Sequence, residues 1–472
     1  MSPALPDAPA DRLPDGFAVR LDPRTRRRDD GATLLGGSPL RLLRLSPRAQ
    51  ALLRDDGLVV VDATTAALAA RLLDAGVAAP ELAGAPTPAG VTVVIPVKDR
   101  PAGLARLLAA LRADRATQKL PVVVVDDGSA VPVEAPGATV LRHPTARGPA
   151  AARNAGLRAA TTGFVAFLDS DCVPRPGWLG LLLPHFADPR LAVVAPRIVE
   201  LPGGRRGFLS GYEAAASALD MGPRAAPVRP LSAVSYVPSA ALLARRAALG
   251  DGFDEAMRVA EDVDLVWRLA DAGWRVRYEP AATVAHEHPA TTGQWLRRRA
   301  FYGTGAALLA RRHGSAVAPV VVNPSTALAW GLALAGGRAG RLGAAGVLGV
   351  TTARLARRLR RPGERLPVAL AAALVLRGSA AGGRTLARSA TRHHWPAALA
   401  AALVSRRARR WVLAAAFADA TLAWWPHRRA VGFLRFAIGR RLDDLGYGAG
   451  LWWGAIRQRE PRALLPAAPP KP

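Results

Sequence analysis

The sequence predicts an α/β protein in which a central domain lies between a small α+β unit and a helical tail. The central domain is indicated by Val-rich runs, such as 91–97 and 121–125, that alternate with amphipathic segments of helical period. Buried β-branched strands that alternate with helices are typical of a parallel sheet in an α/β domain. From about residue 291 onward the chain is rich in Ala, Leu and Arg and is predicted to be helical.

The first part of the chain is predicted to contain a tail, a small unit and a linker. Residues 1–16 are rich in Pro and Asp and are expected to be disordered. Residues 17–83 combine strand-like runs with two helices, the first capped by Ser46 and the second ended by Gly76. This pattern predicts a small α+β domain. Residues 84–90 are rich in Pro and Gly and are predicted to be a linker.

Size and charge restrict the class of protein. A chain of 472 residues, half of them hydrophobic, can bury more than one core. Cys172 is the single cysteine, and the N-terminus has no apolar signal segment, so a reducing cytoplasm is expected. The net charge of +28 comes almost wholly from arginine, which fits either codon bias or attraction to an anionic membrane surface. A nucleic-acid partner is disfavoured, because acids at the strand ends would repel phosphates.

Carboxylates follow three successive strands of the predicted sheet. Asp99 comes after VVIPV, Asp126 and Asp127 after VVVV, and Asp169 and Asp171 after FVAFL. In an open α/β sheet, ligands bind beyond the carboxyl ends of the strands. Unpaired acids crowded at one sheet edge repel one another, so the pattern indicates a shared ligand and a cation.

The segment Asp169-Ser170-Asp171 is the candidate metal site. Residues two apart in an extended chain point the same way, and hard divalent ions such as Mg²⁺ or Mn²⁺ take carboxylate and phosphate oxygens. A solvated loop is the alternative for an isolated Asp-x-Asp pattern, but the buried strand before it favours a metal. Cys172 is expected to be buried beside the site rather than to bind zinc.

Other side chains suit contacts with a nucleotide, a phosphate or a proton. Asp127 can accept hydrogen bonds from a base or ribose, although Asp-Gly is also a turn dipeptide. Arg153 suits phosphate geometry, with a surface position as the alternative. Glu261 and Asp262 begin an amphipathic helix, where the helix dipole stabilises acids. They could cap that helix, or Asp262 could take a proton from an acceptor hydroxyl.

The motifs VVIPVKDR, VVVVDDGS, GPAAARNAG, FLDSD and EDVDLVWRL resemble, in their order and spacing, the family 2 glycosyltransferases with the GT-A fold. The resemblance covers about 91–290. It implies a nucleotide-sugar donor and a divalent metal. It also implies roles for particular residues: a nucleotide pocket lined by Pro96, Asp99 and Asp127, a metal–diphosphate site at Asp169 and Asp171, and a catalytic base at Asp262 beside Glu261.

The same resemblance bears on stereochemistry and on residues after the central domain. No second nucleophile is evident, so inversion at the anomeric carbon is predicted, by analogy with inverting hydrolases. Many relatives carry a histidine near His286 that helps to hold metal or diphosphate, and a solvent-facing loop is the alternative. Gln294 and Arg297 loosely resemble the donor-side Gln-x-x-Arg-Trp motif of polymerising relatives. Arg298 replaces its Trp, which argues against long processive synthesis.

The regions outside the central domain resemble the glycosyltransferases of mycofactocin biosynthesis, through LDPRTRRRDDGATLLGGSPLRLLRLS, GLVVVDATTAALAARLLDAGVAAP and the Ala/Arg-rich tail. The resemblance implies a UDP-glucose donor and an acceptor that is a peptide-derived redox cofactor or its precursor. The unit at 17–83 is similar to winged-helix domains that bind peptides in such pathways, with a mere packing domain as the alternative. The runner-up function is a transferase for cell-wall polysaccharide or lipid-linked glycan. A catalytically inactive sugar-binding scaffold is disfavoured, because the acids are intact.

The tail at 291–472 is predicted to be helical and associated with a membrane. Residues 316–337 carry no charge and are numerous enough to span a bilayer, with a buried helical hairpin as the alternative. The runs LPVALAAALVL and WVLAAAFADATLAWW are shorter or interrupted by Asp419. They suit amphipathic helices that lie on a membrane or pack together. A cytoplasmic protein at the inner face of the cell membrane is therefore expected.

Overall fold

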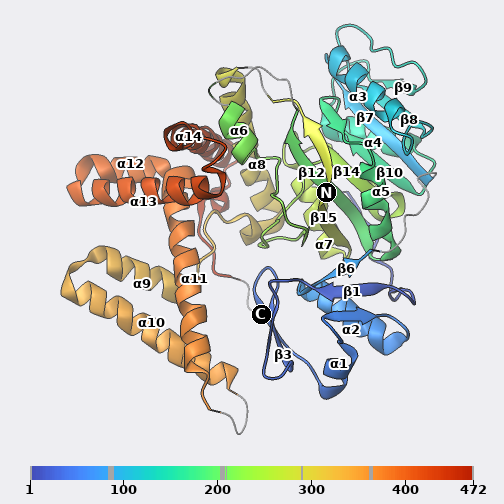
Figure 1. Cartoon of the computed structure of the whole chain (residues 1–472). Coiled ribbons are helices and arrows are strands. Elements are labelled where there is room, and N and C mark those ends of the chain that lie inside the picture. Colours follow the sequence, from blue (N-terminus) through green and yellow to red (C-terminus); the bar gives the residue numbers. More distant parts are fainter. Residues whose placement is uncertain are drawn as a thin grey trace. The chain divides into compact units, whose positions relative to one another are not determined.

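The computed structural model describes residues 3–82, 90–201, 208, 210–288, 291–360 and 365–469. The chain forms two compact units: the first consists of Met1–Arg205 and Ala216–His288, and the second of Arg206–Ala215 and Pro289–Pro472 (Figure 1). The first unit contains both the small N-terminal part and the central domain. The linker predicted at 84–90 lies, apart from Gly90, outside the described residues.

The N-terminal part of the first unit has two small antiparallel sheets, with the orders β5-β1-β6 and β2-β3-β4. Its two helices have the ends that the sequence predicts. Ser46 accepts a hydrogen bond from the N–H of Ala49, and Gly76 ends the second helix in the left-handed conformation. A winged-helix arrangement stays a prediction. The elements are β1 Ala18–Leu21, β2 Arg26–Arg28, β3 Thr33–Gly36, β4 Arg41–Arg44, α1 Pro47–Leu52, β5 Gly57–Val59, α2 Ala63–Ala75 and β6 Ala78–Glu81.

Residues 3–16 pack on the first unit and are not the disordered tail that the sequence predicts. The N–H of Ala8 donates to the carbonyl of Ala272 at 2.9 Å, and the indole N–H of Trp274 donates to the carbonyl of Pro6 at 2.8 Å. Leu13 is buried. The prediction was wrong because the order of this segment comes from contacts with residues far along the chain, which its own composition does not reveal.

The centre of the first unit is a nine-stranded sheet with the order β11-β15-β12-β14-β10-β7-β8-β9, in which β13 also pairs with β15. Strands β10, β7, β8 and β9 are parallel, as predicted, but β14 runs antiparallel to both β10 and β12. The sheet is therefore mixed and not parallel throughout. The strands are β7 Val91–Val97, β8 Val122–Asp126, β9 Thr139–Arg142, β10 Phe164–Leu168, β11 Cys172–Pro174, β12 Leu191–Glu200, β13 Ala226–Pro227, β14 Ala241–Arg245 and β15 Arg275–His286.

Two glycines let helices approach closely to the strand ends. A Cβ at Gly156, in α4 (Pro149–Ala159), would lie 2.2 Å from Cγ1 of Val94 in β7. A Cβ at Gly103, in α3 (Pro101–Ala113), would lie 2.6 Å from the carbonyl oxygen of Ser170. Both helices begin just after a strand-end loop, so this close packing fixes the loops that carry the acids.

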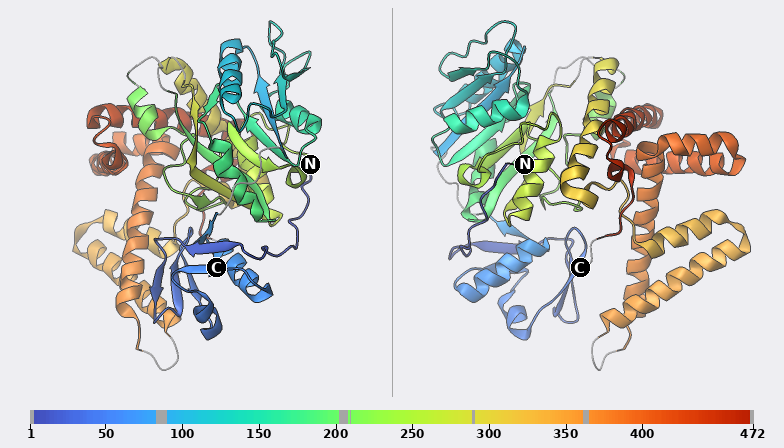
Figure 2. Two further views of the ribbon diagram at one scale, coloured as in Figure 1. Left: turned by 45° about the vertical axis from the view of Figure 1, so that its right-hand side comes forward. Right: turned by 180° about the vertical axis from the view of Figure 1, so that it is seen from behind.

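The second unit is built from helices. Helix α8 (Thr292–His313) packs along α14 (Phe433–Arg457). Two helical hairpins, α9–α10 and α12–α13, project in the same direction from this unit, in pale and deep orange (Figures 1 and 2). The remaining bounds are α6 Ser210–Ala216, α9 Pro324–Ala335, α10 Gly337–Leu359, α11 Val368–Arg388, α12 Trp395–Val404 and α13 Arg406–Trp424.

The segment 316–337 is not the single membrane-spanning helix that its composition allows. Helix α9 begins only at Pro324 and ends before Gly336. Within the described ranges, no helix is both long enough and apolar enough to cross a bilayer. The structure agrees better with the alternative of a helical hairpin, because α9 packs on α10 and buries Ala329. Leu328 of the same helix is 54% exposed.

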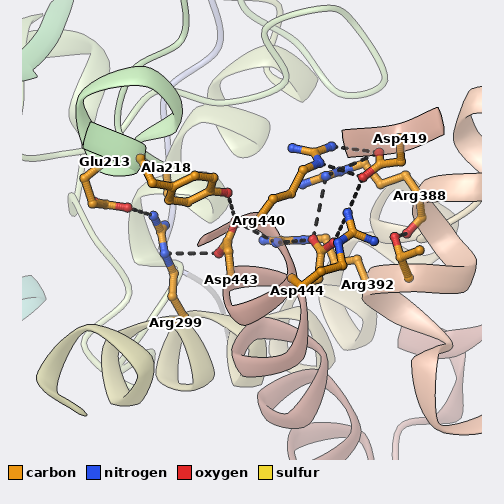
Figure 3. A network of polar contacts seen from close by, with 12 residues as sticks. Glu213, Ala218, Arg299, Arg388, Arg392, Asp419, Arg440, Asp443 and Asp444 are labelled. Atoms are coloured by element: carbon orange, nitrogen blue, oxygen red, sulfur yellow. Dashed lines mark hydrogen bonds and ion pairs between the residues drawn. The ribbon is translucent and has the colours of Figure 1, made fainter. Parts of the chain in front are cut away.

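An ion network buried in the second unit joins six of its segments, among them the short helix Ser389–His393 that follows α11 (Figure 3). Arg440 donates to both carboxylate oxygens of Asp419, at 2.6 and 2.8 Å. Such bidentate pairing, with further arginines nearby, compensates the cost of burying each charge. Asp419, which interrupts an apolar run of the sequence, is therefore a structural residue. The network comprises Glu213, Arg299, Arg388, Arg392, Asp419, Arg440, Arg441, Asp443 and Asp444.

Replacing Gly450 with Ala is expected to destabilise the second unit by about 3 kcal/mol, because overpacking forces helices apart. A Cβ there would lie 1.7 Å from the carbonyl oxygen of Ala300, where α14 crosses α8. The matched control is Gly378→Ala in α11, where a Cβ would meet nothing within 4 Å. That change should leave stability unchanged or raise it slightly. Thermal unfolding of both variants measures the difference, and equal melting temperatures would contradict the tight crossing.

Candidate active site

Three neighbouring parallel strands end at one edge of the sheet, and acids follow each of them. Strands β10, β7 and β8 are adjacent, and Val97 of β7 is in register with Asp126 of β8. Asp99 follows β7, Asp127 follows β8, and the Asp169–Asp171 segment follows β10. The topology therefore brings these carboxylates to the edge where open α/β sheets bind ligands.

Asp127 organises the loop before α4. Its Oδ1 accepts a hydrogen bond from the N–H of Arg147 at 2.9 Å and lies 2.8 Å from Nδ1 of His143. Its Oδ2 accepts the N–H of Gly148 at 2.8 Å. Burial opposes the effect, but the hydrogen bonds from His143 and the two backbone N–H groups lower the pKa of Asp127. Both oxygens already have partners, so a contact with a nucleotide would have to share them.

Asp99 is exposed at the same edge. It adopts the left-handed conformation with φ of 52°, and its carboxylate accepts the N–H of Ala130 at 2.8 Å. Its own N–H donates to Oγ of Ser129 at 2.9 Å. Pro96, which lies within β7 in register with Val125, is partly exposed. Both positions are compatible with the predicted nucleotide pocket, which stays a prediction.

The Asp169–Asp171 turn points its two acids at different partners. Asp169 donates its N–H to the carbonyl of Ala240 at 2.9 Å. Oδ2 of Asp171 accepts a hydrogen bond from Arg100 at 2.9 Å, and its Oδ1 lies 3.4 Å from Nε2 of His286. His286 reaches this position because β15 pairs with β11, which follows the turn directly.

Cys172 is buried beside the acids, as the sequence predicts. Burial raises the pKa of its thiol well above the usual range, and the charges of Asp169 and Asp171 add to the increase. A thiol held in the neutral form is a poor nucleophile and a poor metal ligand. The buried side chain therefore packs beside the turn.

Arg153 connects the two groups of acids. Its Nη2 donates to Oδ1 of Asp169 at 2.6 Å, and its Nη1 donates to Oε1 of Glu261 at 2.9 Å. The side chain is 4% exposed, so the surface position considered for it is wrong. Burial opposes the effect, but the charges of Asp169 and Glu261 raise its pKa. Both terminal nitrogens of Arg153 bond carboxylates, which favours a positioning residue over the direct phosphate contact that its residue type suggests.

Glu261 and Asp262 begin helix α7 (Glu261–Asp271) beside this arginine. The carboxylate of Asp262 accepts the N–H of Ser239 at 3.1 Å and that of Val263 at 2.8 Å. Burial raises the pKa of both acids, and the neighbouring charge of Asp262 raises that of Glu261 further. An acid with a raised pKa holds a proton more readily, which is the property required of a general base.

The donor atoms fit a hard divalent cation with few protein ligands. Asp171 supplies oxygen, His286 supplies an imidazole, and Asp169 keeps an oxygen that Arg153 does not bond. Among the residues that the structure describes, no three His, Cys, Asp or Glu side chains form a ready metal cage. A Mg²⁺ or Mn²⁺ ion commonly takes one or two carboxylates and completes its shell with substrate phosphates.

Sequence reasoning missed the roles of Arg100 and Asn154. Arg100 pairs with Asp171, and only its place after a strand-end acid could have indicated this. Asn154, in the GPAAARNAG motif, bonds both the N–H and the carbonyl of Phe253, at 2.8 Å each. Gln294 and Arg297 are exposed on α8 of the second unit. Their predicted contact with the donor stays a prediction.

Comparison with known proteins places this geometry in a family. Residues 92–249 match the family described as glycosyl transferase family 2. The pre-mycofactocin glycosyltransferase of Mycobacterium tuberculosis is 50% identical over 473 residues, covering 97% of this chain and 99% of that protein. A mannosyltransferase from Pyrobaculum calidifontis, solved with GDP-Man and Mn²⁺, is 20% identical over 73% of this chain and 91% of that chain, with a TM-score of 0.37. GalNAc-T7, solved with UDP, GalNAc and Mn²⁺, is 14% identical over 46% and 51%, with a TM-score of 0.34.

The mixed sheet, its strand-end acids and the family match define a glycosyltransferase with a GT-A domain. A sequence identity of 50% along nearly the whole length of both chains indicates a narrower family within these glycosyltransferases. The chain belongs to the family of pre-mycofactocin glycosyltransferases.

Proposed function

We propose that this enzyme transfers a sugar, glucose from UDP-glucose, to a hydroxyl group of pre-mycofactocin, with inversion at the anomeric carbon and with a divalent metal. The name of the relative supports the acceptor. The observation that supports the mechanism is the bridge made by Arg153 from Asp169 to Glu261. Through it, the acids beside the donor's diphosphate and the acids beside the acceptor form one rigid cluster.

In the proposed reaction, Asp262 takes the proton from the acceptor hydroxyl while the acceptor oxygen bonds to the anomeric carbon. The bond from that carbon to the diphosphate oxygen breaks, and UDP leaves with the electron pair. The N–H groups of Ser239 and Val263 hold the Asp262 carboxylate in place. Because acceptor and leaving group lie on opposite faces of the sugar, a single displacement inverts the configuration.

Asp171, His286 and the free oxygen of Asp169 would hold the metal, which supplies positive charge to the departing diphosphate. Arg100 would share this task, since its guanidinium already contacts Asp171. Asp99 and Pro96 would line the nucleotide pocket at the exposed side of the same edge. These roles follow from the chemistry of the side chains and from their places at the strand ends.

We further propose that the N-terminal part contacts the peptide portion of the acceptor and that the second unit associates with an anionic membrane. Edge strands β2 and β4 expose Arg26, Arg28 and Arg41 along unpaired backbone edges, which suits strand addition. The membrane proposal is supported by arginines and exposed apolar side chains on the helices of the second unit.

Removing the metal or Asp171 is expected to lower UDP release from UDP-glucose by about a hundredfold or more, because the diphosphate would leave without charge compensation. The test measures UDP with pre-mycofactocin as acceptor, with Mn²⁺, with Mg²⁺ and with chelator, for wild type and Asp171→Asn. Asp30→Asn, at an exposed loop position of the N-terminal part, is the matched control. Full activity in chelator would contradict the metal requirement. Activity with only a different nucleotide-sugar would contradict the assignment of UDP-glucose as the donor.

A further inference from the structure

Helix α12 is apolar on every side, yet it buries none of its residues. Its ten residues carry no charge, and Leu399, Leu403 and Val404 are 51, 73 and 88% exposed. A helix that is hydrophobic all round is ordinarily found inside a protein core or a bilayer. Within the part of the chain that the structure describes, nothing covers these three side chains, so they are available to a partner.

Helix α13 extends this apolar surface and adds charge beside it. Trp411, Leu413 and Phe417 are 45, 64 and 65% exposed. The first turns of α13 also expose three arginines close to the apolar tip, at Arg406, Arg409 and Arg410. We define the hairpin tip as the exposed apolar residues of α12 and α13 together with these arginines. Trp and Arg beside aliphatic side chains are typical of helices that lie in a membrane interface.

The second hairpin of this unit meets the hairpin tip. Arg407 donates hydrogen bonds to the carbonyls of Leu334 and Ala335, which end α9. The next residues on α10 expose Arg338 and Arg341. The two hairpins project in the same direction (Figures 1 and 2). The hydrogen bonds of Arg407 therefore join the end of α9 to the hairpin tip.

The helices from α9 to α13 have almost no negative charge. Between residues 324 and 424 the sequence has 16 arginines and two acids, Glu364 and Asp419, and Asp419 is neutralised in the buried ion network. A second copy of the chain would bring the same arginines and a net charge of +28, so like charges would repel. Charge complementarity instead favours a surface that is both apolar and anionic.

We propose that the hairpin tip docks on the surface of a bilayer that contains anionic lipids. The apolar side chains enter the interface, and the arginines contact headgroup phosphates. Ten residues of helix are only about 15 Å long, half of the roughly 30 Å hydrocarbon core, so α12 lies in the interface and does not span it. This deepens the membrane association proposed above, and its test measures binding rather than catalysis.

The full-length protein is sedimented with vesicles of phosphatidylcholine, with and without phosphatidylglycerol. Binding is expected only with the anionic lipid. The double variant Leu403→Ser/Val404→Ser should bind about tenfold more weakly, because two large side chains no longer leave water. The matched control is Val59→Ser/Val61→Ser, at two exposed valines of the N-terminal part, which should bind as wild type does. Thermal unfolding checks that both variants are folded.

The charge contribution is tested in the same way. Arg409→Glu/Arg410→Glu should weaken binding to anionic vesicles by at least about tenfold, whereas Arg26→Glu/Arg28→Glu on exposed β2 should change it far less. Equal loss in both pairs would show that net charge alone governs binding, which overturns the assignment to the hairpin tip. Wild-type binding by the Arg409/Arg410 variant would overturn it too.

A probe at the tip reports its location directly. Leu403→Cys can be labelled with an environment-sensitive dye, because the single natural cysteine is buried. Emission should shift to the blue with anionic vesicles, and a dye at Val131→Cys, an exposed site on the first unit, should not respond. The proposal fails if the Leu403 dye does not shift. It also fails if the Leu403/Val404 variant loses self-association but keeps vesicle binding, since a second copy would then be the occupant.

Discussion

Asp262→Asn is expected to reduce transfer to pre-mycofactocin by about a thousandfold, while the affinity for UDP-glucose changes little. The amide cannot take a proton from the acceptor hydroxyl, but it occupies the same space between Ser239 and Val263. One of the two N–H groups that now face carboxylate oxygens would meet an NH₂ group instead. A stability loss of about 1–3 kcal/mol is therefore expected as well, and it must be measured separately by thermal unfolding.

Glu261→Gln is the matched control, since it removes the adjacent acid on the same helix. Oε1 of Glu261 accepts a hydrogen bond from Arg153. The neutral glutamine side chain should therefore hold Arg153 less firmly, and Glu261→Gln should lower the transfer rate less than Asp262→Asn does. Isothermal titration with UDP-glucose separates donor binding from turnover. If Glu261→Gln abolishes transfer and Asp262→Asn does not, the assignment of the base is reversed.

The pH dependence provides a second signature of the base. Burial raises the pKa of Asp262 above that of an ordinary aspartate. Only the deprotonated carboxylate can accept a proton, so the transfer rate should fall as the pH falls through this raised pKa. The variant Asp262→Asn has no such group, and its residual rate should lack that acidic limb.

The acids at the strand ends could be predicted from the sequence because each group follows an apolar run, rich in β-branched or aromatic residues, that is typical of a buried strand. Strand direction could not be predicted. The residues of β14 are as apolar as those of β10, since both are central strands covered on two faces, and burial does not depend on direction. The antiparallel insertion of β14 nevertheless brings Ser239 beside Asp262 and completes the site.

The bridging role of Arg153 could not be predicted either, because it depends on a contact between residues 108 positions apart. The residue type indicated an interaction with negative charge, and phosphate was the ligand expected. In the structure, Arg153 bonds two carboxylates instead of a phosphate. Asn154 shows the same limit: an amide near a Gly-rich loop suggests a ligand contact, but this one fixes the backbone at Phe253.

Arg153→Met is expected to abolish transfer and to destabilise the first unit by about 3–5 kcal/mol, because it leaves two acids at a buried site without their common partner. Asp169 and Glu261 would repel each other and take up protons. Arg158→Met, on the same helix with a side chain that is 63% exposed, is the control and should stay within about 0.5 kcal/mol of wild type.

Two further variants separate stability from positioning. Arg153→Lys keeps the charge, but one ammonium group cannot reproduce the two-armed bridge to Asp169 and Glu261. It should therefore recover much of the stability and still transfer about a hundredfold more slowly. The double variant Arg153→Met/Glu261→Gln removes one unpaired charge together with the arginine. It should be more stable than Arg153→Met alone and remain inactive, and this coupling is what a double-mutant cycle measures. Wild-type turnover by Arg153→Lys would mean that the cluster needs only a nearby positive charge and that the bridge does not align the acids.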